Sequence, residues 1–309
     1  MIILSIILLI AGFVMLVKGA DWFVDGAASL ASRLGIPQLV IGLTIVAMGT
    51  SLPEAAVSIT AALKGNAGIS IGNVVGSNIL NILIILGITA VMVSVAVQKS
   101  TLFYEIPFML VITAVLLVMG VTGQMVTRVE GIILLLLFIV YLVYLYFLSK
   151  QAKDEEQEEK IEMPVWKCML LIMIGGVLIV LGSDFAVKGA SELARMFGVS
   201  ERFIGLTIVA LGTSLPELVT SVTAARKGNA DIAIGNIVGS NIFNILFVLG
   251  TSALICDIPY AVSFRLDAVI GILAGVLLWI FSIRKRELRR GGGVAMLVAY
   301  AVYFVYLCQ

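Results

Sequence analysis

The sequence predicts an all-α integral membrane protein of ten transmembrane helices, arranged as two inverted five-helix repeats with broken second and seventh helices. Three observations predict this fold class: the composition, ten apolar segments and an internal repeat. Of the 309 residues, 61% are hydrophobic and 13% are charged, and the mean hydropathy of +1.15 lies far above that of soluble domains. Most of the segments have the roughly 20 residues that cross a bilayer. They comprise residues 2–31, 38–63, 68–95, 102–119, 129–149, 165–195, 201–226, 231–256, 266–283 and 293–308.

The composition also excludes several classes of function. The 20 Lys and Arg residues nearly balance the 19 Asp and Glu residues, so we expect no basic face for nucleic acid. Histidine is absent and the three cysteines share no short spacing, which removes the usual zinc, redox and Cys/His catalytic sites. We therefore expect a protein that is not an enzyme and has no cofactor. Its chemistry must come from carboxylate, hydroxyl, amide and backbone groups.

The internal repeat links the two halves at a constant offset of 163 residues. Residues 42–54 have the sequence GLTIVAMGTSLPE, and residues 205–217 have the sequence GLTIVALGTSLPE. A second pair follows at the same offset, with IGNVVGSNILNIL at residues 71–83 and IGNIVGSNIFNIL at residues 234–246. Many transporters consist of two such halves, so the repeat predicts a transporter fold.

The repeat divides the chain into three parts: a first repeat over 1–149, a charged loop over 150–164 and a second repeat over 165–309. Five spans in each repeat turn the second repeat upside down relative to the first. Of the 20 Lys and Arg residues, thirteen lie in odd-numbered loops, five in even-numbered loops and two within spans. Because Lys and Arg favour the cytoplasmic side, we expect a multi-pass plasma-membrane protein with loop 150–164 in the cytoplasm and both termini outside.

The first repeated motif, GTSLPE, predicts a broken helix that carries an acid. Pro53 has no N–H and its ring collides with the carbonyl of Gly49, so the helix cannot continue unbroken. The freed carbonyls are tolerated in a membrane only inside protein or beside a water-filled cavity. Glu54 follows directly, and a charge at the bilayer centre costs about 2.5–3.5 kcal/mol. Pro216 and Glu217 repeat the arrangement, and two such acids favour a functional site over a simple proline kink.

The second repeated motif places polar side chains on one face of the following helix. Asn73, Ser77 and Asn81 are spaced four residues apart, and glycines beside them let another helix approach closely. The corresponding residues of the second repeat are Asn236, Ser240 and Asn244. Two interpretations remain open for these side chains: hydrogen bonds that hold helices together, or ligands of an ion.

These ligand types point to a hard cation. Oxygen ligands without nitrogen or sulfur suit ions such as calcium and sodium. Calcium takes six to eight oxygens, and two bidentate glutamates with the carbonyls of Thr50 and Thr213 would supply about six. Two carboxylates would also neutralise one divalent ion. Sodium could use the same glutamates through additional hydroxyl and carbonyl oxygens, as competition between the two ions requires.

With both motifs present twice, the chain resembles the sodium/calcium exchangers of the calcium/cation antiporter superfamily, prokaryotic members included, over nearly all of its length. The resemblance implies a secondary active antiporter that exchanges calcium for sodium by alternating access, with cations bound at the midplane between the two GTSLPE motifs. It implies calcium ligands at Glu54, Glu217, Thr50 and Thr213. It implies sodium ligands at Ala47, Ser51, Ser77, Asn81, Ala210, Ser214, Ser240 and Asn244, together with the two glutamates.

One departure leaves the choice of ion open. Many members of the family carry aspartate at the position of Asn81 or Asn244, whereas this chain has asparagine at both. Proton/calcium exchange and potassium-dependent exchange are therefore alternatives to sodium coupling. A cation channel is an alternative of a different class, which the broken helices and the deep charge-neutralised site disfavour. The expected partners are calcium and sodium ions and the lipid bilayer, with no nucleic acid and no obligate protein partner.

Overall fold

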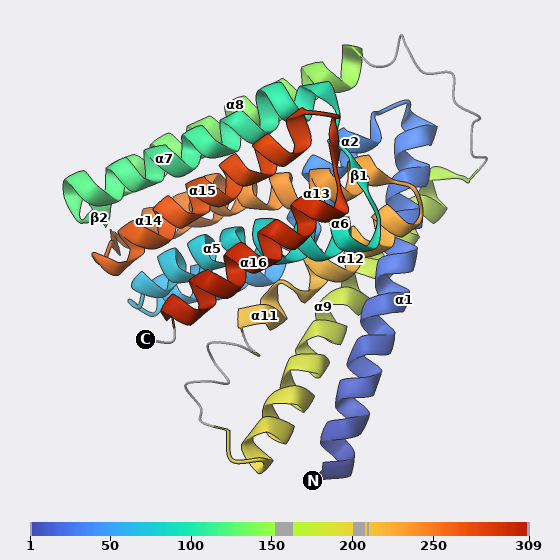
Figure 1. Ribbon diagram of the computed structural model, residues 1–309, viewed down its shortest axis with the longest axis horizontal. Coiled ribbons are helices and arrows are strands. Elements are labelled where there is room, and N and C mark those ends of the chain that lie inside the picture. The colour runs from blue at the N-terminus through green and yellow to red at the C-terminus, as the bar shows by residue number, and fades with distance from the viewer. Residues whose placement is uncertain (1, 152–162, 200–207, 209, 308–309) are drawn as a thin grey trace.

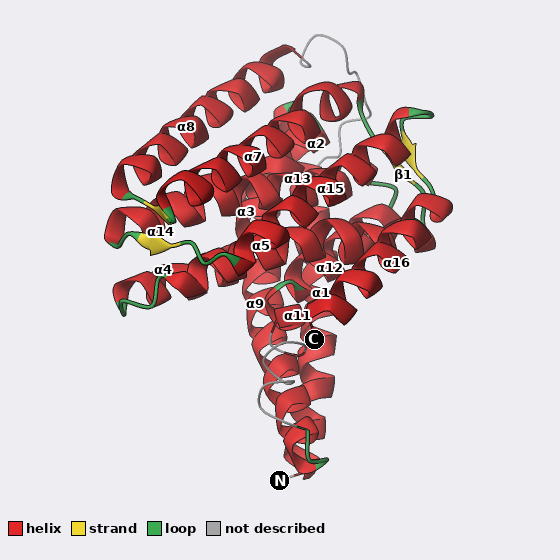
Figure 2. Cartoon of the chain, turned by 60° about the vertical axis from the view of Figure 1, so that its left-hand side comes forward, coloured by secondary structure: helices red, strands yellow, loops and turns green. Residues whose placement is uncertain are grey.

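The structure is a computed structural model that describes residues 2–151, 163–199, 208 and 210–307 (Figure 1). Most of the described chain is helical (Figure 2). The helices of the first half are α1 (Ile2–Leu34), α2 (Gln38–Ile41), α3 (Ala47–Thr50), α4 (Leu52–Leu63), α5 (Gly68–Leu80), α6 (Gly87–Met92), α7 (Ile106–Gly123) and α8 (Arg128–Gln151). Those of the second half are α9 (Val165–Met196), α11 (Ala210–Thr213), α12 (Leu215–Arg226), α13 (Ala230–Phe243), α14 (Gly250–Ile255), α15 (Ser263–Ile283) and α16 (Arg290–Leu307).

The described helices confirm an all-helical membrane protein. Within the described residues, eight helices are long and apolar enough to cross a membrane, and the bent pair Gln38–Thr50 and Leu52–Leu63 makes a ninth candidate. The predicted segment 201–226 lies partly outside the described residues, which contain α11 and α12 of it. Most of the predicted loop 150–164 also lies outside them.

Two local features were not predicted from the sequence. Several spans contain a π-helical turn, and the turns lie at Gly42–Val46, Asn81–Leu86, Thr101–Glu105 and Asn244–Leu249. Four two-residue strands form antiparallel pairs between loops of the two halves. The strands are β1 (Val95–Ala96) with β4 (Glu287–Leu288), and β2 (Met125–Val126) with β3 (Ile258–Pro259). Such short pairs give no apolar periodicity, so nothing in the sequence pattern distinguishes them from loop.

Helices α1 and α9 form a long antiparallel pair that extends beyond the other helices (Figures 1 and 2). Small residues at their contact let the two backbones approach closely. A Cβ atom on Gly19 would lie 2.8 Å from the Gly175 carbonyl oxygen, and one on Gly12 would lie 2.7 Å from the Gly182 carbonyl oxygen. Close packing of this kind holds helices together in lipid, where no hydrophobic force drives their association.

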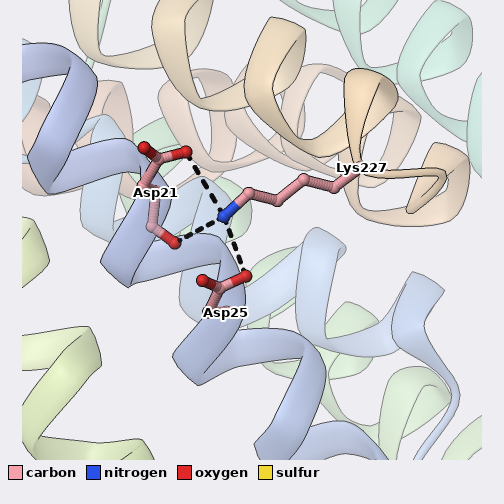
Figure 3. A network of polar contacts seen from close by, with 3 residues as sticks. All are labelled: Asp21, Asp25 and Lys227. Atoms are coloured by element: carbon pink, nitrogen blue, oxygen red, sulfur yellow. Dashed lines mark hydrogen bonds and ion pairs between the residues drawn. The ribbon is translucent and has the colours of Figure 1, made fainter.

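An ionic cluster joins this pair to the rest of the protein (Figure 3). Lys227, directly after α12, lies 2.8 Å from Asp25 Oδ1 and 3.3 Å from Asp21 Oδ1, both on α1. Its ammonium also donates a hydrogen bond to the Asp21 carbonyl at 3.1 Å. The three side chains are partly exposed, so the cluster positions α1 and contributes at most about 1 kcal/mol to stability.

The centre of the molecule is formed by the helices that carry the second motif. Every residue of α13 from Ile232 to Phe243 is buried, and α5 is buried over most of its second half. The outer helices α1, α8 and α16 expose many large apolar side chains, as helices in contact with lipid do. The two copies of the polar motif therefore meet in the interior.

Candidate cation-binding site

The first GTSLPE motif forms the predicted break. Helix α3 ends at Thr50, α4 begins at Leu52, and the two parts of the span are bent by 50°. Pro53 lies in the first turn of α4, where its missing N–H costs no helical hydrogen bond. Glu54 lies in the same turn with an exposed fraction of 0%. An acid at a helix N-terminus is favoured by the helix dipole, which offsets part of the cost of burying it.

The second motif has the same local structure where it is described. Helix α11 ends at Thr213, and α12 begins at Leu215 with Pro216 in its first turn. Glu217 lies in this turn, and its exposed fraction is also 0%. The structure confirms the break at the first motif, shows the corresponding interruption at Ser214 in the described part of the second, and brings both acids into the interior.

The two halves exchange hydrogen bonds across the site. Ser51, from the first half, donates to Glu217 Oε1 at 2.8 Å, and Ser214, from the second half, donates to Glu54 Oε1 at 3.3 Å. Thr213 also interacts with Glu54, and the two carboxylates are close enough to repel each other. Each serine therefore holds the acid of the opposite repeat, and the two glutamates face a common space.

The first asparagine of each polar motif supports the nearby glutamate backbone. Asn73 donates to the Glu54 carbonyl at 3.1 Å and to Ser58 Oγ at 2.9 Å. Asn236 makes the repeat-related bonds, to the Glu217 carbonyl at 3.3 Å and to Ser221 Oγ at 2.9 Å. These two asparagines thus bind protein groups, in agreement with the interpretation as interhelical hydrogen bonds.

The remaining asparagines form a reciprocal network at the contact of α5 and α13. Asn78 and Asn241 each donate to the other's carbonyl at 3.1 Å. Asn81 donates to Asn241 Oδ1 at 3.0 Å, and Asn244 donates to Asn78 Oδ1 at 3.1 Å. Because their amide nitrogens are held in this way, Asn81 and Asn244 have fixed orientations. The orienting role of Asn78 and Asn241 was missed from the sequence, although their recurrence at the 163-residue offset was visible.

Four buried oxygens in this region have no hydrogen-bond partner. They are Glu54 Oε2, Glu217 Oε2, Asn81 Oδ1 and Asn244 Oδ1, and all four residues have exposed fractions of 0%. None of the described ion pairs involves either glutamate. Leaving such groups unpaired in the interior is costly, since a buried charge requires a counter-charge. The arrangement therefore has the chemistry of a site for a hard cation.

The site contains two acids, Glu54 and Glu217. Within the described residues there is no group of three or more His, Cys, Asp or Glu side chains that could hold a metal. The site instead combines two carboxylates with neutral amide, hydroxyl and carbonyl oxygens. Calcium accepts such a mixed set, whereas metals that prefer nitrogen or sulfur find no ligand of their kind here.

The structure describes the other residues expected from the resemblance to differing extents. The Ala47 carbonyl accepts hydrogen bonds from Ser240 and Thr50, both at 3.3 Å, which brings three of the expected ligands together. Thr50 also donates to Asn236 Oδ1 at 3.0 Å. Ser77 is buried on α5. Ala210 is the first residue of α11, and its side chain lies outside the described part of the structure.

Comparison with known families identifies the chain. The family described as sodium/calcium exchanger protein matches residues 4–147 and 167–309. The chain belongs to this family. The two matched segments of this exchanger-family protein correspond to its two halves, and only about twenty residues between them are left out.

Individual relatives match over almost the whole chain. The putative antiporter CaxA of Alkalimonas amylolytica is 39% identical, with 96% of each chain covered. The sodium/calcium exchanger MaX1 of Methanosarcina acetivorans is 35% identical, with 99% of each chain covered. Solved structures of the sodium-calcium exchanger NCX_Mj, soaked with sodium but no calcium in one case, are 32% identical with a TM-score of 0.86 and 99% coverage of both chains. This exchanger-family chain therefore shares its fold with NCX_Mj.

Proposed function

We propose that this protein exchanges calcium for sodium across a membrane, with the transported ions bound between the two GTSLPE motifs. The observation that carries the proposal is the set of four unpartnered oxygens of Glu54, Glu217, Asn81 and Asn244. Two carboxylates balance one calcium ion, so the ion would supply the missing counter-charge. Membership of the sodium/calcium exchanger family supports sodium as the second ion.

The ligand assignment is the one that the family resemblance implies. For calcium we propose the carboxylates of Glu54 and Glu217 with the carbonyls of Thr50 and Thr213. For sodium we propose subsites built from the same carboxylates and the remaining oxygens that were expected from the resemblance. Those residues are Ala47, Ser51, Ser77, Asn81, Ala210, Ser214, Ser240 and Asn244. The contact of Ser240 with the Ala47 carbonyl and the contact of Ser51 with Glu217 support two of these subsites.

We also infer ten spans in two inverted repeats, over 1–149 and 165–309, with both termini outside and loop 150–164 in the cytoplasm. The strand pairs support this topology. Six spans would separate β1 from β4 and four would separate β2 from β3, and an even number returns the chain to the same side. The repeat-related bonds of Asn73 and Asn236 support the approximate symmetry of the two halves.

The experiment that tests the exchange is calcium flux in proteoliposomes under separately imposed gradients of sodium, potassium and protons. We expect calcium uptake when only an outward sodium gradient is imposed. Uptake driven by a pH gradient alone would assign proton/calcium exchange, and a requirement for potassium would assign the potassium-dependent reaction. Calcium movement that is independent of every counter-gradient would indicate a channel and would overturn the proposal.

A further inference from the structure

A third buried glutamate lies far along the chain from both motifs. Glu105 ends the π-helical turn before α7, and its exposed fraction is 1%. Its Oε1 accepts a hydrogen bond from the Tyr144 hydroxyl of α8, whereas Oε2 is buried without a partner. The hydroxyl of Tyr141, also on α8, is a further buried oxygen without a partner. None of the described ion pairs involves Glu105, although acids inside a membrane-spanning segment are costly and functional by default.

Glu105 lines a cavity of about 310 Å³ between α7 and α8. The lining is aromatic apart from Glu105 and one valine, and it comprises Phe103, Tyr104, Glu105, Phe108, Val140, Tyr141 and Tyr144. At least half of the surface of three lining residues is exposed: the exposed fractions are 50% for Phe103, 62% for Tyr104 and 61% for Val140. Because these exposed side chains lie on membrane-spanning helices, the cavity opens toward lipid.

The chemistry of this lining selects an ammonium group. Aromatic faces attract cations, and the attraction grows when the cation is removed from water. An ammonium also has hydrogen-bond donors for Glu105 Oε2 and for the Tyr141 oxygen, while the rings cover its carbon atoms. A bare metal ion fits poorly, since calcium needs six to eight oxygens and the lining offers one carboxylate and three phenols. A neutral apolar ligand would leave the carboxylate without a counter-charge.

A basic cavity adjoins the aromatic one. It has a volume of about 500 Å³ and shares Phe103 with the aromatic cavity, and Leu102 of the same π-helical turn also lines it. Its other lining residues are Lys99, Ile283, Arg284, Lys285 and Arg286. Four cations in one cavity suit a phosphate, which Arg and Lys bind through charge-assisted hydrogen bonds. A carboxylate in an aromatic cavity beside a basic cavity matches a headgroup that carries an amine and a phosphate.

We propose that the cavity around Glu105 binds the ammonium group of an aminophospholipid headgroup, whose phosphate lies against the adjoining basic residues. The site is separate from the exchange reaction and does not depend on it. Its ligand class is a primary-amine phospholipid, of which phosphatidylethanolamine is the probe.

The test uses the full chain in bilayer discs that contain equal amounts of phosphatidylethanolamine and phosphatidylglycerol. Native mass spectrometry then measures which lipids the released protein retains. We expect the parent protein to retain phosphatidylethanolamine selectively, and Glu105→Gln to reduce that selectivity at least about tenfold, which corresponds to about 1.4 kcal/mol. Tyr141→Phe, which removes only the unpartnered hydroxyl, should cause a smaller reduction in the same direction.

The second half provides a matched control. Asp267 on α15 accepts a hydrogen bond from Tyr303 at 2.9 Å, so it is a second carboxylate–tyrosine pair between outer helices. Neither oxygen of Asp267 is among the buried unpartnered atoms of the described residues. We expect Asp267→Asn to retain the selectivity of the parent. Equal retention of both lipids by the parent, or unchanged selectivity in Glu105→Gln, would overturn the proposal.

The source of the amine is tested separately. Dissolved ethanolamine is added to the discs before release of the protein. We expect it to displace phosphatidylethanolamine only weakly, because it lacks the phosphate that the basic cavity would hold. Displacement by ethanolamine as effective as displacement by the lipid itself would assign the cavity to free amines and overturn the lipid assignment. Replacing Arg284 and Lys285 by Gln should weaken retention of both phospholipids.

Discussion

Ser51 of the first half donates a hydrogen bond at 2.8 Å to Glu217 of the second half. The repeat-related bond from Ser214 to Glu54 is longer, at 3.3 Å. Neither half therefore contains a complete site, because each acid depends on a hydroxyl of the other. This reciprocity allows the contribution of each copy of GTSLPE to be measured separately.

We expect Glu54→Gln and Glu217→Gln each to abolish calcium transport while the protein remains inserted and folded. Either change leaves one carboxylate to balance a divalent ion in a site with no described ion pair. The measurement is calcium uptake by proteoliposomes under a sodium gradient. Glu130→Gln is the control, because Glu130 accepts hydrogen bonds from Thr127 at the start of α8 and lies outside the site. Substantial uptake in both motif variants would contradict the assignment of the glutamates.

We expect Ser51→Ala to weaken the response to sodium more than Ser214→Ala does. A hydrogen bond to a charged group contributes about 1.5–3 kcal/mol, and the Ser51 bond is the shorter of the two. The sodium concentration that gives half-maximal calcium flux should therefore rise at least about tenfold in Ser51→Ala. Equal effects of the two substitutions would show that the difference between the two hydrogen bonds does not persist during transport.

We expect Asn78→Ala to weaken sodium binding although Asn78 is not a proposed ligand. Its Oδ1 accepts the hydrogen bond that fixes Asn244, so its removal lets the Asn244 carbonyl turn away from the site. Loss of one such bond costs about 1 kcal/mol, and the unpaired buried amide adds to this. The sodium concentration that gives half-maximal calcium flux should rise about fivefold to thirtyfold.

The control for this change is Asn66→Ala, on the exposed loop before α5. It should leave the sodium concentration for half-maximal calcium flux at the value of the parent protein. If Asn78→Ala also responds to sodium like the parent, Asn244 does not need its amide partner, and the proposed positioning role of Asn78 would have to be withdrawn.

We expect Gly175→Ala to disturb the α1–α9 pair while Gly176→Ala does not. A Cβ atom at Gly175 would lie 2.6 Å from the Phe23 amide nitrogen and 2.7 Å from the Gly19 carbonyl oxygen, both backbone atoms that cannot turn aside. At Gly176 the nearest atom is in the Phe23 ring at 3.5 Å, an ordinary contact. Overpacking typically costs about 1–3 kcal/mol, so thermal unfolding in detergent should begin at a lower temperature for Gly175→Ala alone. Identical unfolding of the two variants would contradict the close contact.

The sequence predicted those parts of the site that repeat. Glu54 and Glu217 could be identified because a proline beside an intramembrane acid occurs twice at one offset, and the helix breaks follow from the same proline. The orienting bonds of Asn78 and Asn241 could not be predicted, because asparagines that bind ions and asparagines that join helices have the same spacing. The family resemblance already singled out Asn81 and Asn244, and the structure adds that each has an unpartnered oxygen, whereas Asn73 and Asn236 donate hydrogen bonds to protein groups.

The ionic cluster on α1 could not be predicted from the repeat, for a different reason. Lys227 binds Asp21 and Asp25 (Figure 3), but the repeat-related position of Asp25 is Lys188. Lys188 pairs with Asp184 on its own helix at 2.6 Å, so the corresponding acid of α9 is already neutralised. The symmetry of the motifs therefore does not extend to these charged residues. Long charged side chains can reach several partners, so spacing in the sequence does not reveal which ion pair forms.

The last prediction tests the inverted topology with a repeat-related pair of loop residues. Asn66 and Asn229 occupy equivalent positions at the 163-residue offset, one before α5 and the other before α13. If the repeats are inverted, single cysteines at these positions must face opposite sides of the membrane. In a background without Cys168, Cys256 and Cys308, an impermeant maleimide added to intact cells should label Asn66→Cys and not Asn229→Cys. Opening the cells should make both accessible, which separates sidedness from burial. Labelling of both cysteines in intact cells would mean that the halves enter the membrane in the same orientation, and the even loops could no longer be assigned to the outside.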